Sequence, residues 1–391
     1  MNKFEFWSPT KVIFGADTVK ATGKEVKEFG GTNVLVFYGS GSAVKSGVLD
    51  MVTKSLEAEG IKYSCVGGVQ INPLAEFAQK AIDDHKDKGI DFVLGVGGGS
   101  VIDTAKAVAF GLANPDVPLW DFFTQKVEVK KGLPVGTVLT IAAAGSETSM
   151  SSVLTNQATG IKRGLNTFFN RPKFAIMDPV LTYTLPDRHT ACGVVDILMH
   201  TLDRYFGRDT NNAVTDELAE ALMRVILENG KIVMEKPRDY KARAELMWAG
   251  SLSHNGLMGL GQVPDMSAHQ LGHVLSSEYD MPHGESLSIM WPAWAKYVYK
   301  DDIPRFAKYA RTVWGVTNTD DEAAALEGIE ATTEYFRKIT MPVTMSEALG
   351  DECKDDAEVL ADYCTFHKTR TIGSLRVLDF DAIKEIYQSA F

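Results

Sequence analysis

The sequence predicts an α/β domain with a parallel, Rossmann-like sheet over residues 1–184, followed by an all-helical domain over residues 185–391. Three observations lead to this fold class. The chain has 391 residues, more than a single hydrophobic core ordinarily serves. Strand-like and helix-like segments alternate in the first half. The second half repeats apolar residues at the helical spacing, so we expect a sheet covered by helices first and helices alone afterwards.

The first half contains short β-branched runs that end in turn-forming residues and lead into helical segments. Asn72, which precedes Pro73, is expected to cap the helix that follows it. Strands that alternate with helices at this spacing predict parallel pairing, with both faces of the sheet covered. We expect strands at residues 33–37, 61–66, 92–96, 134–141 and 173–177, and helices at residues 43–60, 74–85 and 101–110.

The second half is helical from residue 187 onward, because its apolar residues recur every three or four positions. The turn-forming residues Thr182, Pro186 and Asp187 mark the change of pattern, so the domain boundary is expected near residues 180–187. The expected helices are residues 188–206, 212–229, 237–254, 267–277, 286–299, 304–313, 321–339, 355–366 and 379–390.

Composition argues against several classes of partner and location. The formal net charge of -11 repels phosphate backbones and anionic lipids, so neither nucleic acid nor a membrane surface is an expected partner. We expect no transmembrane segment and no secretion signal, because no apolar run of about 18 residues and no basic start followed by an apolar stretch is present. The cysteines lack CxxC spacing, which predicts free thiols and a cytoplasmic location: Cys65, Cys192, Cys353 and Cys364.

Two glycine-rich loops follow predicted strands, at residues 38–42 and 97–100. Glycines let a backbone approach an anion closely, and the helix that follows offers N–H groups and the positive end of its dipole. The Gly-Gly-Gly-Ser sequence alone fits equally well a tight turn that binds nothing, and it is not the GxGxxG fingerprint. Two such loops at strand ends of one sheet nevertheless favour a dinucleotide over a single phosphate.

The first loop also bears on the choice of dinucleotide. An acidic residue after the first strand usually binds the ribose 2′-hydroxyl of NAD. Gly39 occupies that position here, followed by Ser40 and Ser42, so no carboxylate repels a 2′-phosphate. The sequence therefore predicts NADP, with NAD as the alternative.

A group of histidines and one aspartate has the spacing of metal ligands. Asp196 and His200 are four residues apart in a helical segment, as are His269 and His273, and His283 follows in a loop. One carboxylate with several imidazoles suits Fe²⁺ or Zn²⁺, and the absence of CxxC pairs argues against a structural zinc site. Single histidines more often cap helices or fill polar gaps. Five of the eight histidines, however, lie between residues 200 and 283, which favours a metal site.

These residues fall in motifs that resemble those of the iron-containing alcohol dehydrogenases, and most of all the butanol-dehydrogenase-like, NADP-preferring branch. The likeness covers nearly the whole chain. The motifs are residues 97–106 (GGGSVIDTAK), 145–147 (GSE), 178–186 (DP, then T, L and P), 193–196 (GVVD) with His200, 269–273 (HQLGH) and 282–284 (PHG).

The resemblance implies a dehydroquinate synthase-like fold with the active site between an α/β dinucleotide-binding domain and a helical catalytic domain. It implies Fe²⁺, with Zn²⁺ as the alternative, held by Asp196, His200, His269 and His283. It also implies a homodimer that transfers hydride between NADP(H) and a small primary alcohol, such as butanol, or its aldehyde. The implied cofactor contacts are Gly39, Ser40, Ser42, Asn72, Gly98, Gly99, Ser100, Asp103, Thr140, Ser149 and Lys162.

His273 matches a histidine of that family that lies near the metal and is not a ligand. It is the candidate catalytic proton relay, and support of His269 one turn away is the equal alternative. A glycerol-dehydrogenase-like or dehydroquinate-synthase-like enzyme is a rival reading. The pair Asp196 and His200 disfavours it, since those enzymes resemble a three-ligand pattern without that histidine. A non-catalytic nucleotide- or metal-binding protein is the rival from another class.

Overall fold

The computed structural model describes residues 2–209, 212–350 and 356–391. These residues form two compact units. The helical unit comprises the described residues of Met1–Phe6, Pro186–Pro237 and Gly256–Phe391, and the α/β unit comprises Trp7–Leu185 and Arg238–Asn255. The predicted organisation had a single boundary after residue 184. The two units differ from it because the described residues of 1–6 belong to the helical unit and residues 238–255 belong to the α/β unit. The predicted boundary itself stays a prediction.

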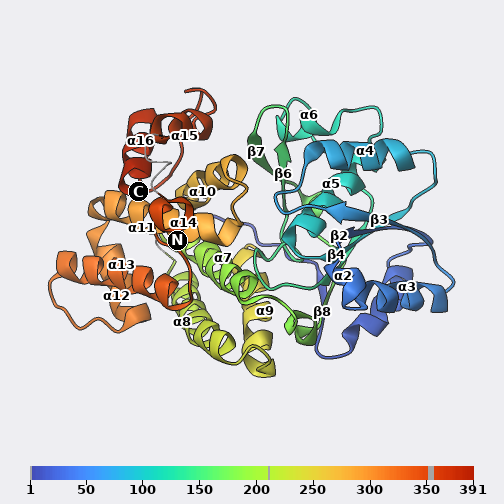
Figure 1. Cartoon of the computed structure of the whole chain (residues 1–391), viewed down its shortest axis with the longest axis horizontal. Helices are drawn as coiled ribbons and strands as arrows, with labels where there is room; N and C mark the ends of the chain where they lie inside the picture. Colours follow the sequence, from blue (N-terminus) through green and yellow to red (C-terminus); the bar gives the residue numbers. More distant parts are fainter. Residues whose placement is uncertain (1, 210–211, 351–355) are drawn as a thin grey trace. The chain divides into compact units, whose positions relative to one another are not determined.

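The α/β unit is built around a six-stranded parallel sheet with the order β1-β8-β5-β4-β2-β3 (Figure 1). This confirms the predicted parallel α/β sheet. Every residue of strand β4 is buried, as expected where helices cover both faces. The strands are β1 (Lys11–Phe14), β2 (Asn33–Gly39), β3 (Lys62–Val69), β4 (Phe92–Gly97), β5 (Val135–Leu139) and β8 (Phe174–Met177).

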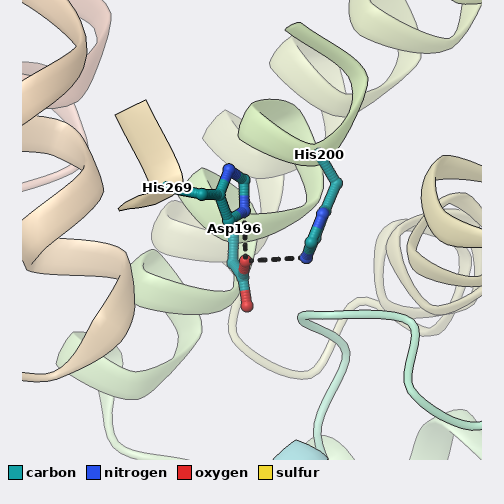
Figure 2. A group of neighbouring side chains, drawn as sticks. All are labelled: Asp196, His200 and His269. Atoms are coloured by element: carbon teal, nitrogen blue, oxygen red, sulfur yellow. Dashed lines mark ion pairs between the residues drawn. The ribbon is translucent and has the colours of Figure 1, made fainter. Parts of the chain in front are cut away.

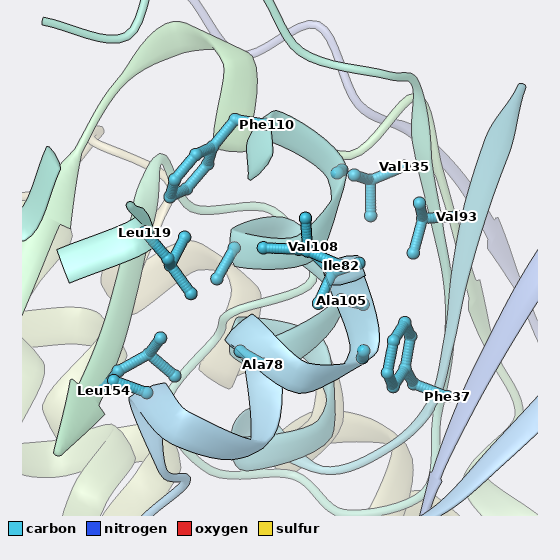
Figure 3. Close-up of a cluster of buried hydrophobic side chains, with 14 of the residues drawn as sticks. Phe37, Ala78, Ile82, Val93, Ala105, Val108, Phe110, Leu119, Val135 and Leu154 are labelled. Atoms are coloured by element: carbon cyan, nitrogen blue, oxygen red, sulfur yellow. The ribbon is translucent and has the colours of Figure 1, made fainter. Parts of the chain in front are cut away.

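Alternate residues of the strands pack on opposite faces of the sheet, because successive strand side chains point in opposite directions. Phe37 and Val93 pack on the face covered by α4 and α5 (Figure 3). Val36 and Leu94 pack on the other face with residues of α3. The helices of this unit are η1 (Thr18–Ala21), α1 (Thr22–Glu28), α2 (Ser42–Lys45), α3 (Val48–Ala58), α4 (Ala75–His85), α5 (Gly99–Ala113), α6 (Leu119–Phe123), η2 (Phe168–Asn170), η3 (Pro179–Thr182) and α9 (Tyr240–His254).

The order of the strands creates a switch point between β2 and β4. The chain leaves β2 toward β3 on one side and leaves β4 toward β5 on the other. Tyr38 pairs with Val96, so Gly39 and Gly97 lie beside each other at the carboxyl ends of these strands. Ligands of open α/β sheets bind outside the strand carboxyl ends at such a point, which is where both glycine-rich loops lie.

Two local predictions in this unit are wrong. The single helix expected at residues 43–60 is divided into α2 and α3, because Gly47 has a φ of 78°, which a continuous right-handed helix does not accommodate. Asn72 does not cap α4, whose N-cap residue is Leu74 with no side-chain cap bond. Asn72 instead has a left-handed φ of 57°. Its side-chain oxygen accepts a 2.9 Å hydrogen bond from Lys162 Nζ.

An antiparallel hairpin of β6 (Ser151–Asn156) and β7 (Ile161–Asn166) has no counterpart among the predicted strands. It is fastened to the loop that follows β3, where the backbone N–H of Thr155 donates a 2.8 Å hydrogen bond to Pro73 O. The hairpin therefore brings its side chains to the loop that carries Asn72.

The helical unit confirms the predicted helical character of the second half. Its described residues contain isolated β-bridges and no assigned strand. Aromatic side chains fill part of its core, and Phe206 stacks on Phe306 with ring centroids 4.2 Å apart. The helices are α7 (Asp187–Tyr205), α8 (Ala213–Glu235), α10 (Ser267–Glu278), α11 (His283–Val298), η4 (Tyr299–Asp301), α12 (Ile303–Trp314), α13 (Asp321–Lys338), α14 (Met345–Leu349), α15 (Ala357–Cys364) and α16 (Phe380–Ser389).

None of the helices in the described ranges is both long enough and apolar enough to cross a lipid bilayer. Cys65, Cys192 and Cys364 are free thiols, as expected from their spacing, and Cys353 lies outside the described residues.

Candidate functional site

Three histidines of the helical unit surround one carboxylate oxygen. His200 lies one turn after Asp196 on α7, His269 belongs to α10, and His283 begins α11. The distances from Asp196 Oδ1 to the Nε2 atoms of these histidines are 3.4, 3.9 and 3.9 Å, in that order. Figure 2 shows the rings of His200 and His269 pointing at this oxygen. The four residues expected to hold a metal therefore lie together.

Close helix packing brings His283 to this group. A Cβ at Gly284 would lie 2.3 Å from the backbone oxygen of Cys192, so a residue other than glycine would push α11 away from α7. Cys192 lies one helical turn before Asp196, which places the start of α11 beside the carboxylate. Arg188 also joins the two helices, because its Nη2 donates a 2.6 Å hydrogen bond to Glu285.

The polar atoms of this group fit a divalent cation. Asp196, His200 and His269 are 5%, 5% and 3% exposed, and their ligand atoms lie within 4.8 Å of one another. Asp196 Oδ1 and His269 Nε2 are buried without a hydrogen-bond partner among the described residues. Buried polar atoms are costly when left unpaired, and one carboxylate with imidazoles is a donor set that suits Fe²⁺ or Zn²⁺. A cation would satisfy both atoms at once.

The charge around His269 also favours a cation. Burial lowers the pKa of its imidazole, but the carboxylates of Asp203 and Asp196 outweigh burial and raise the pKa to about 9. The carboxylates of Asp203 and Asp196 thus stabilise positive charge on this ring.

The sequence interpretation missed two side chains that contact these histidines. Asp203 Oδ2 accepts a 2.7 Å hydrogen bond from His269 Nδ1. Arg204 Nη1 donates to the backbone oxygen of His200 at 2.6 Å and lies 3.2 Å from its Nδ1. Asp203 could have been found from spacing, because positions 196, 200 and 203 share one face of a helix.

His273, the candidate proton relay, lies one turn after His269 on α10. Its ring centroid is 5.2 Å from that of His283. The ring centroid of His283 is in turn 5.4 Å from that of His269, so His283 lies next to both of the histidines of α10. His273 is thus at the edge of the histidine group.

The second predicted site is the glycine-rich loop between β4 and α5 in the α/β unit. A Cβ at Gly97 would lie 2.6 Å from Val101 Cγ2, and one at Gly98 would lie 2.3 Å from Ile141 Cγ2. Neither position has room for a side chain, so the backbone itself forms the surface of the loop. The loop leads into α5, whose first-turn amides and dipole can receive a phosphate group near Gly99 and Ser100.

Other predicted cofactor residues lie along the same edge of the sheet. Gly39 ends β2, and the exposed Ser40 and Ser42 follow it. Thr140 follows β5, where its backbone N–H donates a 3.1 Å hydrogen bond to Gly97 O. Strands β2, β4 and β5 are neighbours, so these residues come together at their carboxyl ends.

Two predicted cofactor residues take part in a buried polar network. The Asp103 carboxylate accepts hydrogen bonds from Ser146 Oγ at 2.5 Å and from the backbone N–H of Val153 at 2.9 Å. The side chain of Ser149 is fully buried, with its hydroxyl 3.3 Å from Lys106 Nζ. These contacts fasten α5 to β6, and direct contact of Asp103 or Ser149 with a cofactor stays a prediction.

Comparison with known proteins gives consistent matches over the whole chain. Residues 9–179 match the family described as iron-containing alcohol dehydrogenase. Residues 190–391 match the C-terminal region of the Fe-containing alcohol dehydrogenase family.

Individual relatives cover the full length of the chain. NADH-dependent butanol dehydrogenase A of Clostridium acetobutylicum is 38% identical over 394 residues, with 100% of both chains covered. The NADPH-dependent aldehyde reductase YqhD of Escherichia coli is 32% identical over 392 residues, again with 100% of both covered. The crystal structure of NADH-dependent butanol dehydrogenase A from Thermotoga maritima superposes with a TM-score of 0.96 at 36% identity, covering 100% of this chain and 99% of the other.

Proposed function

Because the chain belongs to the iron-containing alcohol dehydrogenase family, an oxidoreductase family, we propose that it is a metal-dependent, NADP(H)-linked enzyme that interconverts small primary alcohols and their aldehydes. Butanol and butanal are the proposed substrates, as the names of several relatives suggest. The observation that carries the proposal is the placement of three imidazole nitrogens within 3.9 Å of one buried carboxylate oxygen.

Asp196, His200, His269 and His283 are proposed to hold Fe²⁺, with Zn²⁺ as the alternative. When bound, such a cation supplies Lewis-acid polarisation of the substrate oxygen and stabilises negative charge that develops there. The carboxylate of Asp196 supplies the negative charge that the site needs to retain a dication. The burial of this carboxylate and of His200 and His269 keeps competing water from their ligand atoms.

His273 is proposed to move the proton that the reaction transfers to or from the substrate oxygen. An imidazole titrates near neutral pH and can hold this proton at a ring nitrogen. The contact of its ring with His283 places it beside one of the proposed ligands. Support of His269 by His273 remains the alternative, and a His273→Asn variant that retains metal but loses turnover would favour the relay.

The α/β unit is proposed to bind NADP(H), which when bound supplies or receives the hydride. Gly97 and Gly98 form the backbone surface for the pyrophosphate, and the start of α5 orients it. Gly39 leaves space at the position where a carboxylate would select NAD, and it places no negative charge there. The relatives include enzymes named for each cofactor, so NAD is the alternative to be tested.

We also propose that the enzyme is a homodimer. Exposed aromatic side chains, including Trp7, Phe168 and Phe169, support an interface on the α/β unit. Light scattering of the purified protein should give about twice the mass of one chain, and the mass of a single chain would refute the dimer. The cytoplasmic location expected from the sequence stays a prediction.

Steady-state kinetics test the proposed function directly. Metal-free protein is loaded with Fe²⁺ under anaerobic conditions, or with Zn²⁺, and NADPH or NADH oxidation is followed with linear aldehydes of two to eight carbons. We expect turnover that depends on the metal and is fastest with NADPH. In the opposite direction, oxidation of glycerol in preference to butanol, followed as reduction of NADP⁺ or NAD⁺, would favour the polyol alternative. If the fully metal-loaded protein oxidises neither NADPH nor NADH with any aldehyde of the series, a non-catalytic binding protein would be favoured.

A further inference from the structure

Helix α7 supplies a second carboxylate next to the histidine group. Asp196 and His200 are followed on the same face of the helix by Asp203, whose side chain is 1% exposed. Asp203 Oδ2 accepts hydrogen bonds from His269 Nδ1 at 2.7 Å and from the backbone N–H of His269 at 3.3 Å. One carboxylate of α7 therefore holds both the ring and the backbone of a proposed ligand on α10.

This contact decides which nitrogen of His269 is available to a metal. A carboxylate accepts hydrogen bonds, so the Nδ1 that faces it carries the proton in the neutral ring. The lone pair is then on Nε2, the nitrogen that lies 3.9 Å from Asp196 Oδ1. His269 Nε2 is buried and has no hydrogen-bond partner among the described residues.

We propose that Asp203 is a positioning residue of the metal centre, which fixes the orientation and tautomer of His269 so that Nε2 faces the cation. This inference rests on the proposed function, because it concerns the metal site assigned there. Carboxylates that accept the second N–H of a metal-binding histidine generally strengthen its binding, and their loss typically costs about 10- to 100-fold in metal affinity.

A purely structural role is the alternative. Asp203 also ties α7 to the segment that begins α10, since its backbone oxygen accepts a 2.9 Å hydrogen bond from Asp265 N. Asp265 offers a matched control for such a role. Its buried carboxylate accepts hydrogen bonds from the backbone N–H groups of Ser267, Ser374 and Leu375 at 3.0, 2.7 and 2.8 Å. It supports the same end of α10, and these three hydrogen bonds involve no histidine ring.

The experiment compares Asp203→Asn and Asp265→Asn in the full-length protein. Metal-free protein is titrated with Zn²⁺ against a chromophoric chelator, and with Co²⁺, whose visible absorption reports the coordination geometry. Thermal unfolding of the metal-free proteins measures the structural effect. Asparagine keeps the size of the side chain but can present an N–H to Nδ1, which favours the wrong tautomer of His269.

We expect Asp203→Asn to weaken Zn²⁺ binding by about 10- to 100-fold and to alter the Co²⁺ spectrum. Asp265→Asn should lower the unfolding temperature of the metal-free protein while metal affinity stays near that of the wild type. Equal affinities of Asp203→Asn and wild type, or equal weakening by both substitutions, would overturn the proposal. His269→Ala distinguishes failure of the role proposed for Asp203 from failure of the proposed metal site. If His269→Ala binds Zn²⁺ like the wild type, the proposed metal site itself is wrong.

Discussion

Lys162 and Asn72 lie 90 positions apart in the sequence, yet Lys162 Nζ donates a 2.9 Å hydrogen bond to Asn72 Oδ1. The contact joins strand β7 to the loop that follows β3. Both residues are among the predicted cofactor contacts, and the hairpin of β6 and β7 is what brings them together. Two contacts that were expected separately thus form one polar group beside the carboxyl ends of the sheet.

Loss of this lysine should weaken cofactor binding. Lys162→Met removes a cation that can pair with cofactor oxygens, and hydrogen bonds to charged groups are worth about 1.5–3 kcal/mol. We therefore expect the KM for NADPH to rise by roughly tenfold or more, with a smaller change in kcat. The exposed Lys130→Met is the matched control. Equal KM values for the two variants would show that Lys162 does not contact the cofactor.

Gly39 provides a test of cofactor choice. A Cβ at Gly39 would meet Val69 O at 3.7 Å and Val101 Cγ2 at 3.9 Å, which are ordinary contacts, so a side chain fits. Gly39→Asp should raise the KM for NADPH by about tenfold or more through repulsion of the 2′-phosphate, and should leave or improve use of NADH. Gly39→Ala controls for added volume. An unchanged ratio of NADPH to NADH use in Gly39→Asp would contradict the placement of the ribose beside Gly39.

The sheet could be predicted because its determinants are local. Strand β4 is a short apolar run that ends in glycines, and the six buried positions of the structure match that pattern. The division between α2 and α3 is harder to predict from the sequence, because the helix breaks only where Gly47 takes a φ of 78°. A glycine within a helical pattern is compatible with either outcome, and packing decides between them.

Other features depend on contacts between distant segments. The hairpin strands Ser151–Asn156 and Ile161–Asn166 are short and largely polar, so neither carries a clear alternating pattern. The association of α9 with the α/β unit likewise follows from packing, for example from Thr148 Oγ1, which donates a 3.2 Å hydrogen bond to Ser251 O. Spacing did group the proposed metal ligands, whereas the hydrogen bond from His269 to Asp203 became evident only once α7 and α10 were placed.

Lys106 gives the α/β unit a pH-dependent stability. Its Nζ is buried and donates to Ser151 O at 2.7 Å and Ser146 Oγ at 2.9 Å. Burial lowers the pKa of Lys106 to about 8, although the Asp103 and Glu147 carboxylates oppose this. The unfolded chain keeps a lysine pKa of about 10.4 and therefore binds more protons than the folded chain between about pH 8 and 10.4.

The contribution of Lys106 to stability should thus be least favourable below pH 8 and should improve as the pH rises toward 10.4. The expected gain is on the order of 1–3 kcal/mol relative to Lys106→Met, which lacks the titrating group. Urea unfolding of both proteins at pH 7, 8.5 and 10 measures this difference. Parallel pH dependences of wild type and Lys106→Met would contradict the lowered pKa.

The most direct test of the account is the metal content and turnover of His269→Ala beside His189→Ala. His189 is exposed on α7, the helix that carries Asp196 and His200, so its replacement controls for loss of a histidine from the same unit. Each protein is loaded with Fe²⁺ or Zn²⁺, freed of unbound metal, and assayed by elemental analysis and butanal reduction. We expect His189→Ala to match the wild type and His269→Ala to lose metal and turnover together. Full metal occupancy and wild-type turnover in His269→Ala would contradict the metal centre on which the proposed function depends.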